Sequence, residues 1–296
     1  MESGPKVAVI TGASRGIGRE IALTLAREER MAIVVAAKSV TERANLPGTI
    51  YSVAEECRAA GAPDALPVPL DVRDDASIER MVEAVRQRYG RIDLLVCNAG
   101  ALWWKRVVDT PMSRFDLVHE VNARGSFACA RAVLPTMLRQ RSGMIITMSP
   151  PIELGALAGK TGYMMSKFGM TMLAHGLGGE LRGTGVVAVA LWPATLIESF
   201  ATINFQLGER SQWRKATILA DCVRLLMTDA QAEQVNGAAL IDEDYMRRRG
   251  VHDFRAYRCV ESVEPPRAWP PTHEWVSTAR DPQKLPPGVY NERARL

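Results

Sequence analysis

Tyr163, Lys167 and Ser149 are side chains that together can move a proton to or from an oxygen atom. Tyr163 and Lys167 are four residues apart in a Met-rich segment with a helical pattern, so both should lie on one helix face. We expect the Lys167 ammonium to lower the pKa of Tyr163 from its ordinary value of about 10. Ser149 follows the apolar run 144–148, a predicted strand, and strand ends carry catalytic side chains in open α/β sheets. A Tyr and a Lys at this spacing also occur as a plain surface contact, so the pair alone decides nothing.

A glycine-rich turn near the N-terminus predicts a dinucleotide site. The apolar run 6–10 leads into Thr11-Gly12-Ala13-Ser14-Arg15-Gly16-Ile17-Gly18, and a helical pattern follows. Glycines let backbone amides approach a pyrophosphate, and the N-terminus of the next helix favours the anion. The spacing is Gly-x-x-x-Gly-x-Gly, which becomes fair evidence because a strand and a helix flank it.

The residues after the second predicted strand favour NADP(H), with NAD(H) possible. Lys38 ends the apolar run 31–37, and no Asp or Glu lies between Met31 and Val40 to accept hydrogen bonds from a free ribose hydroxyl. Lys38 and Arg15 would together face the 2′-phosphate, and a paired Arg15→Ala and Lys38→Asp change should shift the preference toward NAD(H). In the alternative, Lys38 points to solvent, Arg15 does not touch nucleotide, and both cofactors bind comparably.

Strands alternate with helices along the chain, which predicts a three-layer, doubly wound α/β fold with a seven-stranded parallel sheet. The predicted strands cover 6–10, 31–37, 65–72, 92–97, 144–148, 186–191 and 238–241. Helices are expected at 51–60 and 76–89, in a long segment from Pro111 to about Pro135 with Asn122 mid-way, and around Tyr163. We expect one domain over 1–241 and, at 242–296, an extended tail packed on it, because that stretch is rich in Pro and Arg.

The composition is that of a soluble globular protein, with 47% apolar residues, 24% charged residues and a net charge of +4. No apolar run approaches the roughly 18 residues of a membrane span, and no basic stripe suggests a nucleic-acid partner. Five cysteines without a Cys-x-x-Cys pair and four scattered histidines indicate neither a disulfide framework nor a metal site. Reduced thiols fit a cytoplasmic protein.

The ordered set of motifs resembles the short-chain dehydrogenase/reductase superfamily between about Lys6 and Ile241. The motifs are Thr11-Gly12-x-x-x-Gly16-x-Gly18, Asn98-Ala99-Gly100, Asn122, Ser149 and Tyr163-x-x-x-Lys167. Finer details, such as Leu46-Pro47-Gly48-Thr49 and Ile241-Asp242-Glu243-Asp244, are similar to the hydroxysteroid dehydrogenase-like branch and its bacterial relatives, some of which act on citronellol-type alcohols. The resemblance implies a Rossmann-type domain and an oxidoreductase.

The resemblance also implies a role for each motif residue. Tyr163 would be the general acid/base, Lys167 would lower its pKa and hold the nicotinamide ribose, Ser149 would orient the substrate oxygen, and Asn122 would anchor a proton-relaying water. The cofactor would contact Gly12, Ser14, Arg15, Gly16, Ile17, Gly18, Lys38, Asp71, Val72, Asn98, Ala99, Gly100, Tyr163, Lys167, Pro193, Thr195 and Ile197. Two departures are Cys97, where many members have Asn, and Ala194, where most have Gly; the latter leaves open whether Thr195 or Ser199 faces the nicotinamide.

Two functional hypotheses follow: an NADP(H)-dependent oxidoreductase acting on an alcohol or carbonyl of an apolar (terpenoid, fatty or steroid-like) substrate, and a cofactor-binding regulator or scaffold with little turnover. The complete Asn-Ser-Tyr-Lys set favours the enzyme. The aromatic residues Trp103, Trp104, Phe200, Phe205 and Trp213 either line an apolar substrate pocket or belong to the core.

Assembly and location can also be predicted. By the same resemblance, the helix of Tyr163 and the segment 216–227 would pair with symmetry mates in a homodimer or homotetramer, with the nearby methionines supplying an apolar face or, alternatively, filling the monomer core. Ala294-Arg295-Leu296 matches a loose peroxisomal signal, the alternative to the cytoplasm in a eukaryote.

Overall fold

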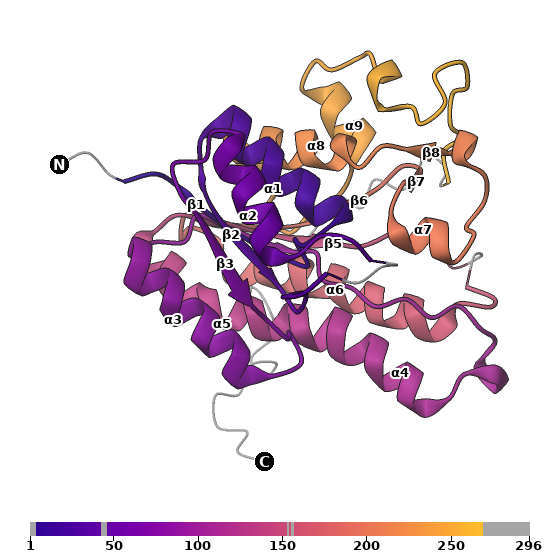
Figure 1. The fold of residues 1–296 in the computed structure, drawn as a ribbon, viewed down its shortest axis with the longest axis horizontal. Coiled ribbons are helices and arrows are strands. Elements are labelled where there is room, and N and C mark those ends of the chain that lie inside the picture. The colour runs from indigo at the N-terminus through magenta and orange to yellow at the C-terminus, as the bar shows by residue number, and fades with distance from the viewer. Residues whose placement is uncertain (1–3, 43–45, 153, 155–156, 269–296) are drawn as a thin grey trace, which may run out of the picture.

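The computed structural model describes residues 4–42, 46–152, 154 and 157–268. Within these residues a seven-stranded parallel sheet has the order β3-β2-β1-β4-β5-β6-β9, which confirms the predicted doubly wound α/β fold (Figure 1). The strands are β1 (Val7–Thr11), β2 (Ala32–Ala37), β3 (Ala65–Pro69), β4 (Leu94–Cys97), β5 (Gly143–Met148), β6 (Val186–Trp192) and β9 (Ala239–Ile241). Every residue of β1, β2 and β6 is buried, as expected for a parallel sheet that is covered on both faces.

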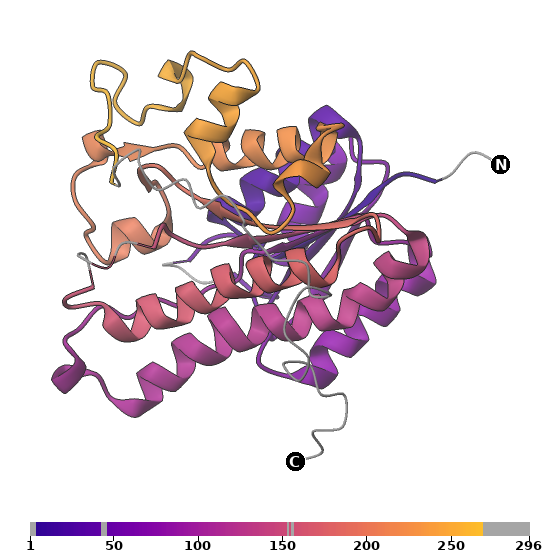
Figure 2. The same cartoon turned by 180° about the vertical axis from the view of Figure 1, so that it is seen from behind.

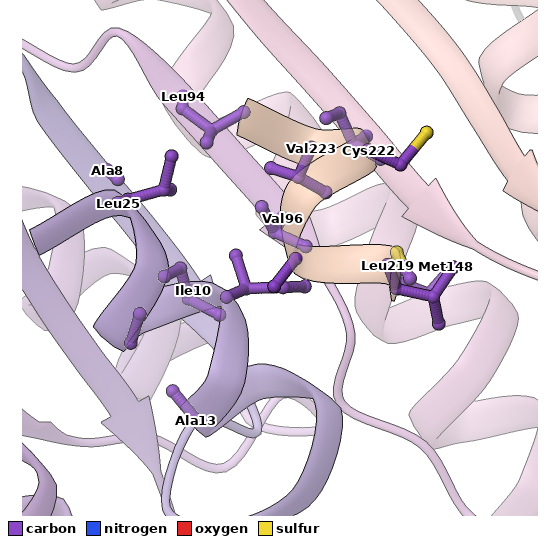
Figure 3. Close-up of a cluster of buried hydrophobic side chains, with 14 of the residues drawn as sticks. Ala8, Ile10, Ala13, Leu25, Leu94, Val96, Met148, Leu219, Cys222 and Val223 are labelled. Carbon is purple, nitrogen blue, oxygen red and sulfur yellow. The ribbon is translucent and has the colours of Figure 1, made fainter. Parts of the chain in front are cut away.

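Two layers of helices cover the sheet (Figures 1 and 2). One layer contains α1 (Gly16–Glu29), α2 (Ile50–Ala59) and α8 (Thr217–Thr228); the other contains α3 (Asp75–Tyr89), α5 (Gly125–Gln140) and α6 (Thr161–Glu180). Helix α1 packs along α8, although the two are far apart in the sequence. Figure 3 shows Leu219, Cys222 and Val223 of α8 in the same buried cluster as Ile10 of β1 and Leu25 of α1.

The long helical segment predicted after Pro111 is interrupted at its middle. Helix α4 (Met112–Val118) passes into a π-helical stretch, His119–Arg124, before α5 begins. Asn122 lies in this stretch and is fully buried. Such π-helical insertions are rare and often mark functional sites, because the widened turn redirects a side chain.

A small lid region lies between β6 and α8. It comprises β7 (Leu196–Ile197), α7 (Phe200–Asn204) and β8 (Trp213–Arg214), and β7 and β8 pair in parallel. None of the helices in the described part of the chain is long and apolar enough to span a membrane.

The prediction of an extended tail from residue 242 is wrong for its first part. Asp242–Arg248 form helix α9, with acidic residues in the first turn and arginines in the last, an arrangement that suits the helix dipole. Tyr245, Met246 and Phe254 are buried in the core cluster, so residues 242–268 pack on the domain, as Figure 1 shows beside α8. Residues 269–296, including Ala294-Arg295-Leu296, lie outside the described residues.

Candidate active site

A cleft of about 850 Å³ lies at the carboxyl ends of the parallel strands. The residues that directly follow β2, β5 and β6, namely Lys38, Ser149 and Pro193, all line it, as does Asn98 after β4. The strand order reverses between β1 and β4, the place where open α/β sheets bind their ligands. Of the residues predicted as site residues, the cleft is lined by Gly12, Ser14, Arg15, Gly16, Ile17, Lys38, Asp71, Val72, Asn98, Ala99, Gly100, Ser149, Tyr163, Lys167, Pro193, Thr195 and Ile197. Gly18 and Asn122 are not among the lining residues.

The glycine turn needs its glycines for two different reasons. Gly12 and Gly16 have φ angles of +67° and +56°, in the left-handed region where a side chain is strained. A Cβ at Gly18 would come within 2.6 Å of Asn98 Nδ2, so this glycine lets α1 approach the loop after β4. Asn98 Nδ2 donates to the carbonyl of Thr11 at 2.9 Å and so joins the ends of β1 and β4.

One end of the cleft is rich in cations. Arg15 donates to a loop that follows β2: its Nη2 atom lies 3.1 Å from Ser39 Oγ and 2.8 Å from the carbonyl oxygen of Gly48, and its Nε atom lies 3.1 Å from that of Pro47. Lys38 lies beside it on the cleft wall. Arg15 therefore shapes this loop as well as adding positive charge.

Asp71 lines the same end. Its carboxylate accepts hydrogen bonds from Arg73, with Nη2–Oδ2 at 2.7 Å and Nε–Oδ1 at 3.0 Å. The hydrogen bond from Arg73 lowers the pKa of Asp71 to about 2, with a smaller contribution from the charge of Lys38. Asp71 is consequently ionised and fixed in orientation.

The other end of the cleft holds Tyr163, Lys167 and Ser149, which the sequence places far apart and the fold brings to one cavity. Lys167 is nearly buried, and its Nζ atom donates to the carbonyl oxygen of Met148 at 2.8 Å. Ser149 Oγ lies 2.9 Å from Thr171 Oγ1, which also accepts a hydrogen bond from Trp192 Nε1 at 3.1 Å. Thr171 thus fixes the direction of the Ser149 hydroxyl from behind.

The expected lowering of the Tyr163 pKa by Lys167 is wrong for this structure. Burial raises the pKa of the phenol, and the same loss of solvent lowers the pKa of Lys167 to about 8. The Lys167 ammonium donates instead to the Met148 carbonyl at the end of β5. Tyr163 is therefore a protonated phenol near neutral pH, the form that can donate a proton.

Asn122 holds the loop after β4 against the start of α6. Its Oδ1 atom accepts from the amide of Ala101 at 2.8 Å, and its Nδ2 atom donates to the Ala101 carbonyl and to Ser166 Oγ, both at 2.9 Å. Ser166 in turn donates to the carbonyl of Tyr163 at 2.6 Å. The π-helical turn thus aims Asn122 at the backbone on either side of the cleft.

Some of the aromatic residues line the cleft and others do not. Trp104 and Phe200 line the cleft, and the Trp104 ring lies 6.2 Å from that of Tyr163 in an edge-on arrangement. Trp213 is buried and donates from Nε1 to the carbonyl of Leu207 at 2.8 Å, whereas Phe205 is 46% exposed. The guanidinium carbon of Arg114 lies over the Trp103 ring, 5.0 Å from the ring centre.

Sequence reasoning missed several residues that line the cleft. Leu219 comes from α8 and Ala268 from the chain after α9, and no local pattern marks either residue as part of the cleft. Asp242-Glu243-Asp244 do not line the cleft, but these three carboxylates directly follow a buried strand and so lie at the edge of the sheet that carries it. Both Asp242 and Glu243 are buried.

Comparison with known proteins agrees with this arrangement. The short chain dehydrogenase family matches residues 6–206. Hydroxysteroid dehydrogenase-like protein 2 of Danio rerio is 38% identical over 260 residues, or 86% of this chain, which spans 60% of that protein's length. A Xanthomonas campestris protein of known crystal structure is 37% identical in sequence, with a TM-score of 0.83 over 90% of this chain and 98% of its own. A metagenomic short-chain oxidoreductase in complex with NADP is 27% identical, with a TM-score of 0.68 over 81% of this chain and 97% of its own. The chain therefore belongs to the short chain dehydrogenase family of oxidoreductases.

Proposed function

We propose that this protein is an NADP(H)-dependent oxidoreductase that interconverts an alcohol and a carbonyl of an apolar substrate. The observation that supports this most is the single cleft that joins the glycine turn and Lys38 at one end to Ser149, Tyr163 and Lys167 at the other. A dinucleotide needs an anion site and a reaction site separated along one groove, and the cleft offers both.

The residues present fit a nicotinamide dinucleotide. The left-handed glycines open the turn before α1, so that backbone amides and the helix N-terminus can meet a pyrophosphate. Asp71 and Val72 would contact the adenine, Lys38 and Arg15 the 2′-phosphate, and Thr195 and Ile197 the carboxamide end. The cofactor would supply or accept the hydride. The NADP bound by the metagenomic relative supports the choice of phosphorylated cofactor.

The catalytic side chains would act on the substrate oxygen. In the reducing direction negative charge develops on that oxygen, and a neutral hydrogen-bond donor stabilises it. Tyr163 is protonated and would donate the proton, while Ser149 would orient the oxygen from its position beside Thr171. In the oxidising direction Tyr163 would first give up its own proton, and the phenolate would then accept the proton of the alcohol. Lys167 lines the same end of the cleft and would bind the nicotinamide ribose.

The walls near Tyr163 favour an apolar substrate. Leu102, Trp104, Leu117 and Phe200 line this end of the cleft together with Leu207. Burial of apolar surface stabilises a bound ligand by about 25 cal/mol per Å² of surface removed from water. Terpenoid, fatty or steroid-like alcohols and ketones present such surface next to one oxygen.

A substrate panel tests the proposed activity. We expect the reduced-nicotinamide absorbance to change when the protein is mixed with NADP(H) and an apolar alcohol or carbonyl, and to stay constant with short polar analogues. Nucleotide binding measured by fluorescence gives the parallel control. Tight nucleotide binding without turnover on any member of a broad panel would favour the regulator or scaffold instead.

We also infer a homodimer or homotetramer that uses the α5–α6 face. Met170 packs in the core and Met164 lines the cleft, but Met165 and Met172 are 53% and 57% exposed and lie two helical turns apart on α6, and Phe127 of α5 is 58% exposed. Exposed apolar side chains on two neighbouring helices favour association with a second copy. The proposed location is the cytoplasm.

Charges on this face should separate the subunits. A double Met165→Glu and Met172→Glu change is expected to give a monomer in light scattering at micromolar concentration, because association would bury two carboxylates. Met112→Glu, at an exposed position on α4, is the matched control and should leave the assembly intact. A monomeric unmodified protein would contradict the inference.

A further inference from the structure

A buried carboxyl group outside the cleft holds the loop that follows β6. Asp242 is the first residue of α9 and is 1% exposed. Its Oδ1 atom accepts hydrogen bonds from the amide of Ala194 at 2.8 Å and from that of Glu243 at 2.7 Å. Ala194 lies between Pro193 and Thr195, which both line the cleft. The Asp242 side chain therefore reaches the backbone of a cleft loop without entering the cleft.

The same loop is held from its other side. The amide of Ala268 donates to the carbonyl of Ala194 at 2.8 Å, and Ala268 itself lines the cleft. Both backbone polar groups of Ala194 are thus bonded to the stretch 242–268, which we call the C-terminal segment. Since each bond fixes one direction of the peptide, the loop cannot shift without breaking one of them.

Arg214 connects the lid region to this segment. It is 1% exposed and donates to Glu243 Oε1 at 2.7 Å, to the carbonyl of Phe254 at 3.2 Å and to Glu264. Its own carbonyl accepts from the amide of Glu198 at 2.8 Å, just after β7. A buried guanidinium with this many partners fixes geometry, because an unpaired buried charge is costly. The C-terminal segment, the lid and the loop after β6 thus form one connected unit.

We propose that Asp242 is a positioning residue for the reaction: by holding Ala194 it sets the loop 193–197 against the nicotinamide end of the cleft, so that the C-terminal segment controls the alignment of cofactor and substrate. This rests on the proposed function, because it requires a nicotinamide at that end. A misplacement of about 1 Å between reacting groups can cost about 10²-fold in rate. Asp242 does not line the cleft, and its effect passes through Ala194.

Two substitutions separate positioning from charge. Asp242→Asn keeps an acceptor oxygen for Ala194 and Glu243, and it resembles the protonated acid, which is well populated near neutral pH because burial raises the pKa of Asp242 to about 7. Asp242→Leu has a similar size but no acceptor. Tyr245→Phe is a control on the same helix: it removes a hydroxyl that donates to Asp229 at 2.6 Å, away from the loop.

The decisive measurement compares two ligands of each folded variant. NADPH spans the cleft, whereas 2′,5′-ADP occupies only the Lys38 end. We expect Asp242→Leu to bind NADPH about tenfold more weakly and to lower kcat about 10²-fold, with 2′,5′-ADP affinity unchanged. Asp242→Asn and Tyr245→Phe should keep near-normal values for both ligands and for kcat.

Two results would overturn the proposal: an equal loss of affinity for NADPH and for 2′,5′-ADP, or a folded Asp242→Leu protein with normal kcat. If Asp242→Leu does not fold, Ala268→Pro replaces it, since a proline at this exposed, cleft-lining position lacks the amide hydrogen that makes the second bond to Ala194. For Ala268→Pro we again expect a loss of kcat without a loss of 2′,5′-ADP affinity, and a normal kcat would contradict the proposal. An unmodified protein that binds neither NADPH nor NADH would instead refute the proposed function.

Discussion

Tyr163→Phe is expected to lower kcat by about 10²–10⁴-fold while the protein stays folded and binds cofactor normally. The change removes one oxygen atom from the wall of the cleft and leaves the ring that packs against Trp104. Without the phenolic proton, the charge on the reduced oxygen has no acid to neutralise it. Steady-state rates with the best substrate of the panel, together with a fluorescence titration of NADPH, measure both expectations.

Tyr257→Phe is the matched control. Its hydroxyl donates to Asp221 at 2.7 Å and neither residue lines the cleft, so its removal should leave kcat unchanged. Near-normal turnover by Tyr163→Phe would eliminate Tyr163 as the acid. Parallel loss of NADPH binding would show that the substitution had damaged the cleft and not the chemistry.

Reversal of charge at Lys38 is expected to exchange the cofactor preference. In Lys38→Asp, the carboxylate should repel the 2′-phosphate of NADP(H) and accept hydrogen bonds from the free ribose hydroxyls of NAD(H). One charge-assisted hydrogen bond is worth about 1.5–3 kcal/mol, which corresponds to roughly a 10- to 100-fold change in kcat/KM for NADP(H). The ratio of kcat/KM values for the two cofactors is the quantity to measure.

The structure favours this single change over the paired change that includes Arg15. Arg15 also donates hydrogen bonds to Ser39, Pro47 and Gly48. Arg15→Ala should therefore disturb the loop and weaken the binding of both NAD(H) and NADP(H). Lys6→Asp, at the amino end of β1 and so at the opposite edge of the sheet, controls for the change in net charge. Equal efficiency of the unmodified protein with NAD(H) and NADP(H) would refute the assignment.

The sequence predicted the fold well because the evidence for it is local. Continuous apolar runs produced the buried strands, and the residues directly after those runs, such as Lys38 and Ser149, do lie at the cleft. A parallel sheet brings all carboxyl ends of its strands to one edge, so the strand assignments already predicted which side chains would meet.

The failures concern contacts that only the tertiary structure decides. Spacing placed Lys167 near Tyr163 but gave no information on the Met148 carbonyl, which binds the ammonium. Likewise, the sequence placed Asn122 mid-way along one long helix, because no composition signal marks the π-helical turn that carries it. The abundance of Pro and Arg after residue 241 concealed α9, whose stability depends on burying Tyr245 against the core.

The packing of α1 against α8 has a consequence for biosynthesis. The cluster in Figure 3 joins Ala8 and Ile10 from the start of the chain to Leu219 and Val223 from its last third. A ribosome releases β1 long before α8, so this inner strand of the sheet has an uncovered apolar face until α8 is made. Contacts between such distant segments slow folding and expose surfaces on which chains aggregate. The core around β1 and α1 therefore cannot be completed during translation until α8 has left the exit tunnel.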